Sequence, residues 1–229
     1  MKKIGFVGAF DKTNLIMYTA KVLQDMNNRI LVIDGTMLQK TRYIVPTISH
    51  AKLYITEFQK IDFAVGFQSI EQIMQYLQMG SASEDSLPYD YILIDVDNRV
   101  ALRTFDVINS SNLYFVTGFD MYSLKRGLDI FNNSEEQVKL TKILYSNNIT
   151  KEDEEYLNYL SLEYKITWDD MELYCPLLDI DNKAIEENQR VDKIRVKRLS
   201  NNYQQSIIYI VQNILGGQSV GTIKRSIIE

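Results

Sequence analysis

A lysine and a threonine, Lys12-Thr13, stand in the stretch VGAFDKTNL (residues 7–15), between a short apolar run and a longer stretch with helical spacing. In a phosphate-binding loop, the chain leaves a strand and curls around the anion, and the next helix presents its free N–H groups and positive dipole end. The lysine adds positive charge, and the threonine hydroxyl reaches Mg²⁺. The placement of Lys12 and Thr13 therefore predicts a phosphate site.

The same stretch departs from the full pattern G-x-x-x-x-G-K-[ST]. Phe6 and Asp11 occupy its two glycine positions, which leaves Gly8 as the glycine of the loop. Aspartate tolerates a left-handed backbone better than most residues, so we expect the curl of the chain to persist. Its carboxylate would nevertheless face phosphate at close range and weaken binding, unless it turns outward or binds the metal. The sequence thus predicts a retained loop shape with reduced affinity.

Carboxylates follow two further apolar runs. Residues 30–33 lead into Asp34, and residues 91–94 lead into Asp95, with Asp97 two positions later. The carboxyl ends of neighbouring parallel strands meet at the edge of the sheet where ligands bind, and carboxylates there hold Mg²⁺ directly or through water. Strand-end aspartates also occur in folds without nucleotide, but their combination with Lys12-Thr13 favours a nucleotide and magnesium site.

The elements that must position these residues follow an alternating order. Apolar runs predict strands at 4–7, 30–33, 63–65, 91–94, 113–116 and 143–145, and helical spacing or helix-start signals predict helices at 15–26, 70–77, 151–160 and 201–215. Residues 41–61 have no helical period, and we expect a loop there with an extra strand or a short hairpin. This alternation predicts an α/β fold with a doubly wound, mostly parallel sheet and helices on both faces.

Composition narrows the class of protein. A chain of 229 residues that is 45% hydrophobic predicts one domain over residues 1–217, followed by a flexible or amphipathic tail at 218–229. The net charge of -5 argues against a general nucleic-acid binder. A single cysteine, Cys175, and a single histidine, His50, argue against disulfides, zinc sites and a Ser-His-Asp triad. Without a signal peptide or a long apolar run, we expect a cytosolic location.

Two charged or amphipathic stretches are candidate contact surfaces. The first is a basic cluster formed by Arg190, Lys193, Arg195, Lys197 and Arg198. No aromatic residues that could stack on bases are interleaved with it, so we favour a solvated face over a contact with nucleic acid or an anionic surface. The second is the tail, where Val220, Ile223 and Ile227 share one side of a short helical pattern. Membrane contact through the tail is less favoured than a frayed or partner-bound segment.

The order of these motifs resembles that of the deviant Walker A ATPases of the MinD/ParA class, over nearly the whole chain. The segments that carry the resemblance are VGAFDKT, ILVIDGT, YDYILIDVD, NLYFVTGFDMYSLKRGLDIF and YCPLLDIDNKAIEENQRVDKI. The resemblance implies an ATP site with Mg²⁺ held by Thr13 and Asp95, and a base-contacting loop at Pro176-Leu177. The residues that we predict to line the nucleotide are Gly8, Asp11, Lys12, Thr13, Asn14, Asp34, Asp95, Asp97, Pro176 and Leu177.

The departures from this family pattern bear on catalysis. Val7 stands where the family has a lysine that reaches across a dimer, Asp11 replaces the last loop glycine, and Thr36 replaces the second aspartate of D-x-D. Such a degenerate loop is similar to that of the CpaE/TadZ-like branch, whose members localise pilus or secretion machinery. The resemblance therefore implies a pseudo-ATPase with weak or absent hydrolysis.

Three hypotheses for function follow from these observations. The first is a spatial organiser or partner-binding switch that positions a pilus, secretion or partition apparatus, with protein partners and a homodimer implied by the resemblance. The second is an active Mg²⁺-dependent ATPase in which Asp11 or Asp97 compensates for the missing groups. The third is an interaction scaffold that has lost the nucleotide.

Overall fold

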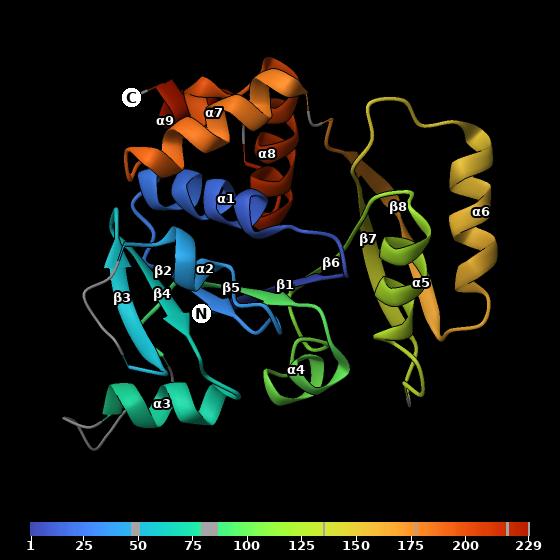
Figure 1. Ribbon diagram of the computed structural model, residues 1–229, viewed down its shortest axis with the longest axis horizontal. Helices are drawn as coiled ribbons and strands as arrows, with labels where there is room; N and C mark the ends of the chain where they lie inside the picture. The colour runs from blue at the N-terminus through green and yellow to red at the C-terminus, as the bar shows by residue number, and fades with distance from the viewer. Residues whose placement is uncertain (47–50, 79–86, 135, 177, 219, 229) are drawn as a thin grey trace.

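An eight-stranded sheet forms the centre of the molecule (Figure 1). The computed structural model describes residues 1–46, 51–78, 87–134, 136–176, 178–218 and 220–228. The strands lie in the order β3-β4-β2-β5-β1-β6-β7-β8, and every neighbouring pair is parallel except β3 with β4. Their bounds are β1 Lys2–Val7, β2 Ile30–Asp34, β3 Tyr54–Phe58, β4 Ile61–Val65, β5 Tyr91–Val96, β6 Asn112–Thr117, β7 Val138–Leu144 and β8 Ile166–Tyr174. The predicted mostly parallel, doubly wound α/β fold is confirmed.

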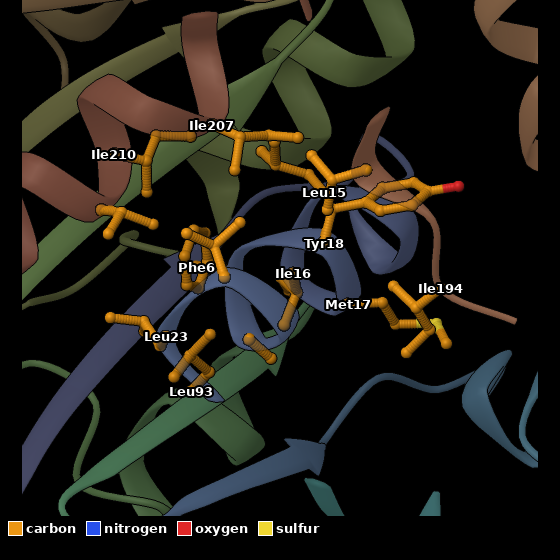
Figure 2. Close-up of a cluster of buried hydrophobic side chains, with 14 of the residues drawn as sticks. Phe6, Leu15, Ile16, Met17, Tyr18, Leu23, Leu93, Ile194, Ile207 and Ile210 are labelled. Carbon is orange, nitrogen blue, oxygen red and sulfur yellow. The ribbon is translucent and has the colours of Figure 1, made fainter. Parts of the chain in front are cut away.

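The helices cover both faces of the sheet. On one face lie α1 (Thr13–Asp25), α7 (Asp179–Arg190), α8 (Asn201–Ile214) and α9 (Val220–Ile228). On the other lie α3 (Ile70–Gln78), α4 (Arg99–Thr104), α5 (Met121–Asp129) and α6 (Lys151–Ser161). Each face has its own apolar core, because the central strands bury side chains on both sides. In Figure 2, Leu15 of α1 and Ile207 of α8 lie together above Phe6 of β1.

The segment predicted as a loop with a strand or hairpin contains both a hairpin and a short helix. Strands β3 and β4 pair antiparallel from Tyr54↔Val65 to Phe58↔Ile61. Gln59 and Lys60 connect them with φ of 53° and 63°, which is the left-handed pair required by a two-residue type I′ turn. The short helix α2 (Thr41–Ile44) precedes the hairpin and was not predicted. His50, noted in the sequence, lies outside the described residues.

The C-terminal segment packs onto the body of the molecule. Helix α9 buries Ile223 and Ile227 in the core that α1 and α8 share. These side chains are therefore occupied by internal contacts rather than free for a membrane surface. Among the described helices, none has the length and apolar character needed to cross a membrane.

Helix α6 begins with a reciprocal cap that the sequence places at Thr150. The Thr150 hydroxyl accepts from the N–H of Asp153 at 3.2 Å, and the Asp153 carboxylate accepts from the N–H of Thr150 at 2.9 Å. Replacement of a capping threonine by alanine leaves a helix-end N–H without its partner and costs roughly 1 kcal/mol. We expect Thr150→Ala to lower the free energy of unfolding by that amount in urea denaturation. Thr104→Ala, at an exposed position that ends α4, is the control; an equal loss in both variants would contradict the cap's role.

Candidate functional site

The loop between β1 and α1 turns sharply at its one glycine. Gly8 has φ of +151°, and a Cβ at this position would lie 2.1 Å from the carbonyl oxygen of Val116. Only glycine allows the loop to approach β6 this closely. Within residues 8–13, all of which are described, positive φ occurs at Gly8 alone, so Asp11 does not need the left-handed conformation that we considered for it.

Phe10 anchors the middle of the same loop. Its ring stacks on Tyr145 with a centroid distance of 4.7 Å. It also lies against Gly118, where a Cβ would come within 3.1 Å of the Phe10 ring. This packing fixes the path of the chain from Gly8 to the start of α1.

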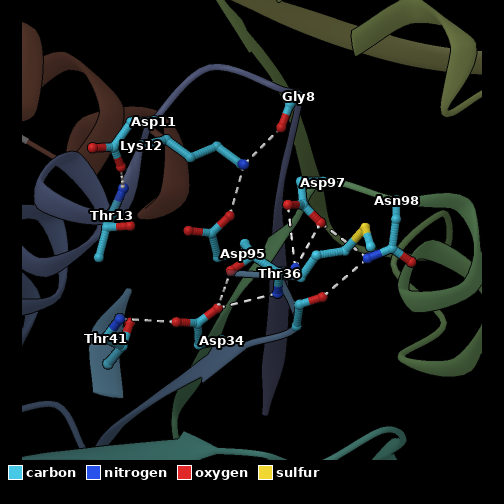
Figure 3. A network of polar contacts seen from close by, with 12 residues as sticks. Gly8, Asp11, Lys12, Thr13, Asp34, Thr36, Thr41, Asp95, Asp97 and Asn98 are labelled. Atoms are coloured by element: carbon cyan, nitrogen blue, oxygen red, sulfur yellow. Dashed lines mark hydrogen bonds and ion pairs between the residues drawn. The ribbon is translucent and has the colours of Figure 1, made fainter. Parts of the chain in front are cut away.

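The side chain of Lys12 folds back under the loop (Figure 3). Its Nζ donates to the carbonyl oxygen of Gly8 at 2.9 Å and lies 2.7 Å from Oδ1 of Asp95. The side chain is 2% exposed, so this is a buried ion pair. Both charges are thus balanced inside the protein without a ligand.

Asp95 supplies the carboxylate of this ion pair from the end of β5. Apart from Lys12, its buried Oδ1 has no hydrogen-bond partner within the described part of the chain. Burial raises the pKa of Asp95 to about 7, with Asp34 acting in the same direction and Lys12 opposing it. A carboxylate at a strand end suits a Mg²⁺ ligand, because Mg²⁺ is usually held by one or two protein groups together with phosphate oxygens.

The raised pKa of Asp95 makes stability depend on pH. Between the ordinary pKa of 3.8 and about 7, the folded chain holds a proton that the unfolded chain releases, so the free energy of unfolding falls as pH rises through this window. Relative to Asp95→Asn, we expect the wild type to lose roughly 4 kcal/mol across that window. Urea unfolding at about pH 4, 5.5, 7 and 8 measures the difference. A difference that does not change with pH would contradict the shift, and Asp170→Asn on β8 controls for loss of a surface charge.

Asp11 places a negative charge at the start of α1. Its Oδ1 accepts from the N–H of Thr13 at 3.2 Å, and its Oδ2 pairs with Nζ of Lys40 at 2.7 Å. Burial opposes ionisation of Asp11, but the Lys40 ammonium and the Thr13 N–H outweigh it and lower the pKa of the carboxyl. The side chain therefore remains a carboxylate at the helix end where a phosphate would bind.

Asp34 organises the loop that follows β2. Its Oδ1 accepts from the N–H and the hydroxyl of Thr36 at 3.1 and 2.6 Å, and its Oδ2 accepts from the N–H of Thr41 at 3.0 Å (Figure 3). The loop is thereby held so that Lys40 reaches Asp11. Asp34 therefore has a structural role, because it holds the loop that follows β2.

Asp97 and its neighbour connect β5 to the same loop. The Asp97 carboxylate accepts from the N–H of Met37 at 3.0 Å and from the amide of Asn98 at 3.0 Å. Asn98 caps α4 through the N–H of Ala101 and also reaches the carbonyl oxygen of Gly35. These contacts join the ends of β2 and β5 into one polar network.

The remaining predicted site residues lie beside this centre. Asn14 accepts from the amide of Gln189 at 3.1 Å, and it borders a groove of about 730 Å³ between α1, α2 and α7. Pro176 stands between β8 and α7, whereas Leu177 lies outside the described residues. Cys175 is buried, which raises the pKa of its thiol to about 12 and makes it unreactive.

No metal-binding cluster of three or more His, Cys, Asp or Glu side chains occurs within the described ranges. A Mg²⁺ ion at Thr13 and Asp95 would therefore depend on phosphate oxygens for the rest of its coordination. Of the contacts that define the site, those of Lys40, Phe10 and Asn98 were not predicted. Nothing in residue type marks them, because each depends on the path of a loop.

Solved structures with a similar fold include a ParA family ATPase, a cell division protein and McdA. The chain matches a ParA family ATPase from Chlorobium tepidum TLS at 15% identity and a TM-score of 0.60, covering 93% of this chain and 98% of that one. It matches the MinD cell division protein of Aquifex aeolicus at 11% identity and a TM-score of 0.60, covering 96% of this chain and 99% of that one. It matches apo McdA of Cyanothece at 10% identity and a TM-score of 0.61, covering 94% of this chain and 100% of that one.

No protein-family model matches the sequence, and no curated protein sequence is similar to it. At these identities the structural matches show the fold. The expected resemblance to MinD/ParA P-loop ATPases is thereby confirmed for the architecture of the chain.

Proposed function

We propose that this chain is a MinD/ParA-like spatial organiser that acts as a partner-binding switch, with weak ATP binding and slow or absent hydrolysis. The neighbours of the fold support a positioning role, since they include partition and cell division proteins and a complex of Cyanothece McdA with ATP. A pilus, secretion or partition apparatus is the kind of assembly that it would position. It would act in the cytoplasm and reach a membrane or polar site through partners.

The observation that carries the proposal is the Asp11 carboxylate at the start of α1. It accepts from the Thr13 N–H, which is one of the groups that a phosphate-binding loop offers to its anion. Lys40 holds Asp11 in place by the ion pair of 2.7 Å. The negative ATP phosphates would be repelled by this carboxylate or would have to displace it. ATP binding is therefore weak in the described conformation.

The positions at which the family has catalytic groups carry residues that are uncharged or already hydrogen-bonded within the protein. Val7 is a buried strand residue with no charge to contribute. Thr36 donates its hydroxyl to Asp34, and Asp97 accepts from the N–H of Met37. The alternative of an efficient ATPase, in which Asp11 or Asp97 compensates, therefore has less support. When Mg²⁺ and ATP bind, Thr13 and Asp95 would hold the metal, which would neutralise phosphate charge.

Apolar side chains around the site suit a protein partner. The segments that follow β2, β5 and β6 all begin at the carboxyl end of the parallel strands. The loop after β2 exposes Met37 and Leu38, and the first turns of α4 and α5 expose Val100, Met121 and Tyr122. Large apolar groups gathered at one edge are typical of interaction surfaces. A second copy of the chain, or a protein of the assembly that the chain positions, would bind there. A solved structure of MinD from Aquifex aeolicus contains such a partner, MinC.

Phosphate release under saturating ATP and Mg²⁺ tests the catalytic part of this proposal. We expect release no faster than from an Asp95→Ala preparation. Turnover well above that background, and lost in Asp95→Ala, would establish the active ATPase instead.

One observation favours a scaffold without nucleotide. The Lys12–Asp95 ion pair and the Asp11–Lys40 ion pair balance the site's charges internally. A thermal shift assay with ATP, ADP and GTP separates the two functions, because a ligand at about 100 times its Kd adds about 2.7 kcal/mol of stability. No shift at millimolar nucleotide would favour the scaffold over the switch.

A further inference from the structure

A second cavity lies away from the phosphate loop, between α4 and the segment that joins α5 to β7. Its volume of about 330 Å³ is in the range of small-molecule sites. The apolar part of its lining is formed by Leu102, Ile108, Ile130 and Val138. Polar side chains complete it, and the two that matter most are Arg99 and Arg103.

The two arginines lie one helical turn apart on the same face of α4. Like charges at this spacing repel each other. The buried Nε of Arg99 has no hydrogen-bond partner in the described part of the chain, and its Nη2 reaches only the carbonyl oxygen of Asp129 at 3.4 Å. Arg103 forms no ion pair with any described residue. A buried N–H without a partner is costly, which points to a missing acceptor.

The carboxylates that are described in the lining of the cavity do not supply that acceptor. Asp106 lines the cavity but is paired with Lys3 and accepts from the amide of Asn109. Glu136 is exposed and pairs with neither arginine. The positive charge of Arg99 and Arg103 is therefore not neutralised within the described structure.

We propose that this cavity binds a small organic anion, a carboxylate or a phosphate monoester. Arg99 and Arg103 hold the anionic head, since guanidinium groups match such oxygens in paired hydrogen bonds. The apolar body of the ligand packs on Ile108, which is the half-buried apolar side chain of the lining. This site is separate from the phosphate loop and does not depend on nucleotide binding there.

Calorimetric titration with phenyl phosphate and with benzoate tests the proposal on the full chain. We expect saturable binding of one molecule per chain for at least one probe, and the two probes distinguish a phosphate from a carboxylate ligand. Inorganic phosphate, which lacks the apolar body, should bind at least tenfold more weakly than phenyl phosphate. Benzyl alcohol, which lacks the charge, should not bind.

Single-residue variants test whether the two arginines of this cavity hold the anion. Arg103→Gln should weaken binding at least tenfold without loss of thermal stability, because Arg103 is exposed. Arg99→Gln should do the same, with its melting temperature checked first. Arg190→Gln, an exposed arginine of α7 on the opposite face, is the matched control and should bind as the wild type does. Absence of saturable binding, unchanged affinity in Arg103→Gln, or equal binding of inorganic and phenyl phosphate would overturn the proposal.

Discussion

Asp11→Gly is expected to tighten ATP binding by roughly 10- to 100-fold, the equivalent of about 1.4 to 2.8 kcal/mol. The substitution removes the carboxylate that accepts from Thr13 N–H and that faces incoming phosphate. Two like charges a few ångströms apart near a protein surface repel by a few kcal/mol, so an effect of this size follows even with partial neutralisation by Lys40. The freed Lys40 would add a positive charge to the same site.

Calorimetric titration with ATP and Mg²⁺ measures this change. Asp11→Asn keeps the size of the side chain and removes its charge, so it should recover most of the gain if charge is the cause. Asp170→Asn, an exposed carboxylate of β8, controls for net charge and should bind ATP as the wild type does. Equal affinity in the wild type and Asp11→Gly would contradict the inhibitory role of Asp11.

Lys12→Met is expected to lower the free energy of unfolding by roughly 3 to 5 kcal/mol at about pH 8, because it leaves a buried carboxylate unpaired. That carboxylate belongs to Asp95, whose pKa is raised to about 7 with Lys12 present. At about pH 5, Asp95 is protonated in both proteins, because its pKa is about 7 with Lys12 present and rises further when the ammonium is lost. The destabilisation should therefore be much smaller at pH 5 than at pH 8.

Urea denaturation of Lys12→Met and of the double variant Lys12→Met/Asp95→Asn tests this coupling. The double variant should recover most of the stability at pH 8, since it contains no buried unpaired charge. Lys125→Met, at an exposed position of α5, is the control and should cost little at either pH. A loss of equal size at both pH values would contradict a buried ion pair. Because Lys12 supports the fold, a loss of ATP binding in its variants is informative only after their stability has been measured.

The sheet was predictable where the buried strands form continuous apolar runs. Runs such as those in β2 and β5 are continuous and apolar because helices cover them on each side. Strand β7 was predicted only at its end, because Lys139, Thr141 and Lys142 interrupt its apolar pattern. Strand β8 was missed because it lies at the edge of the sheet, where Asp169 and Asp170 interrupt the apolar pattern. Helix α4 was missed because its few residues are too short for a helical period.

The candidate site was predictable to the extent that the parallel sheet defines it. Asp34 and Asp95 are direct neighbours in register between β2 and β5, so their meeting at one edge follows from the strand assignments. The partner of Asp11 could not be predicted in the same way. Lys40 reaches it only because Asp34 fixes the intervening loop through Thr36 and Thr41. Such contacts depend on loop conformation, which has no periodic signal in the sequence.

The amide of Thr13 gives the most direct test of whether Asp11 occupies the phosphate site. In ¹H–¹⁵N spectra of threonine-labelled protein, titration with ATP and Mg²⁺ should shift this resonance at a nucleotide concentration at least tenfold lower in Asp11→Gly than in the wild type. Thr150, which lies in the cap of α6, is the internal reference and should not move. A Thr13 resonance that saturates at the same ATP concentration in both proteins, or that moves in neither, would contradict the account.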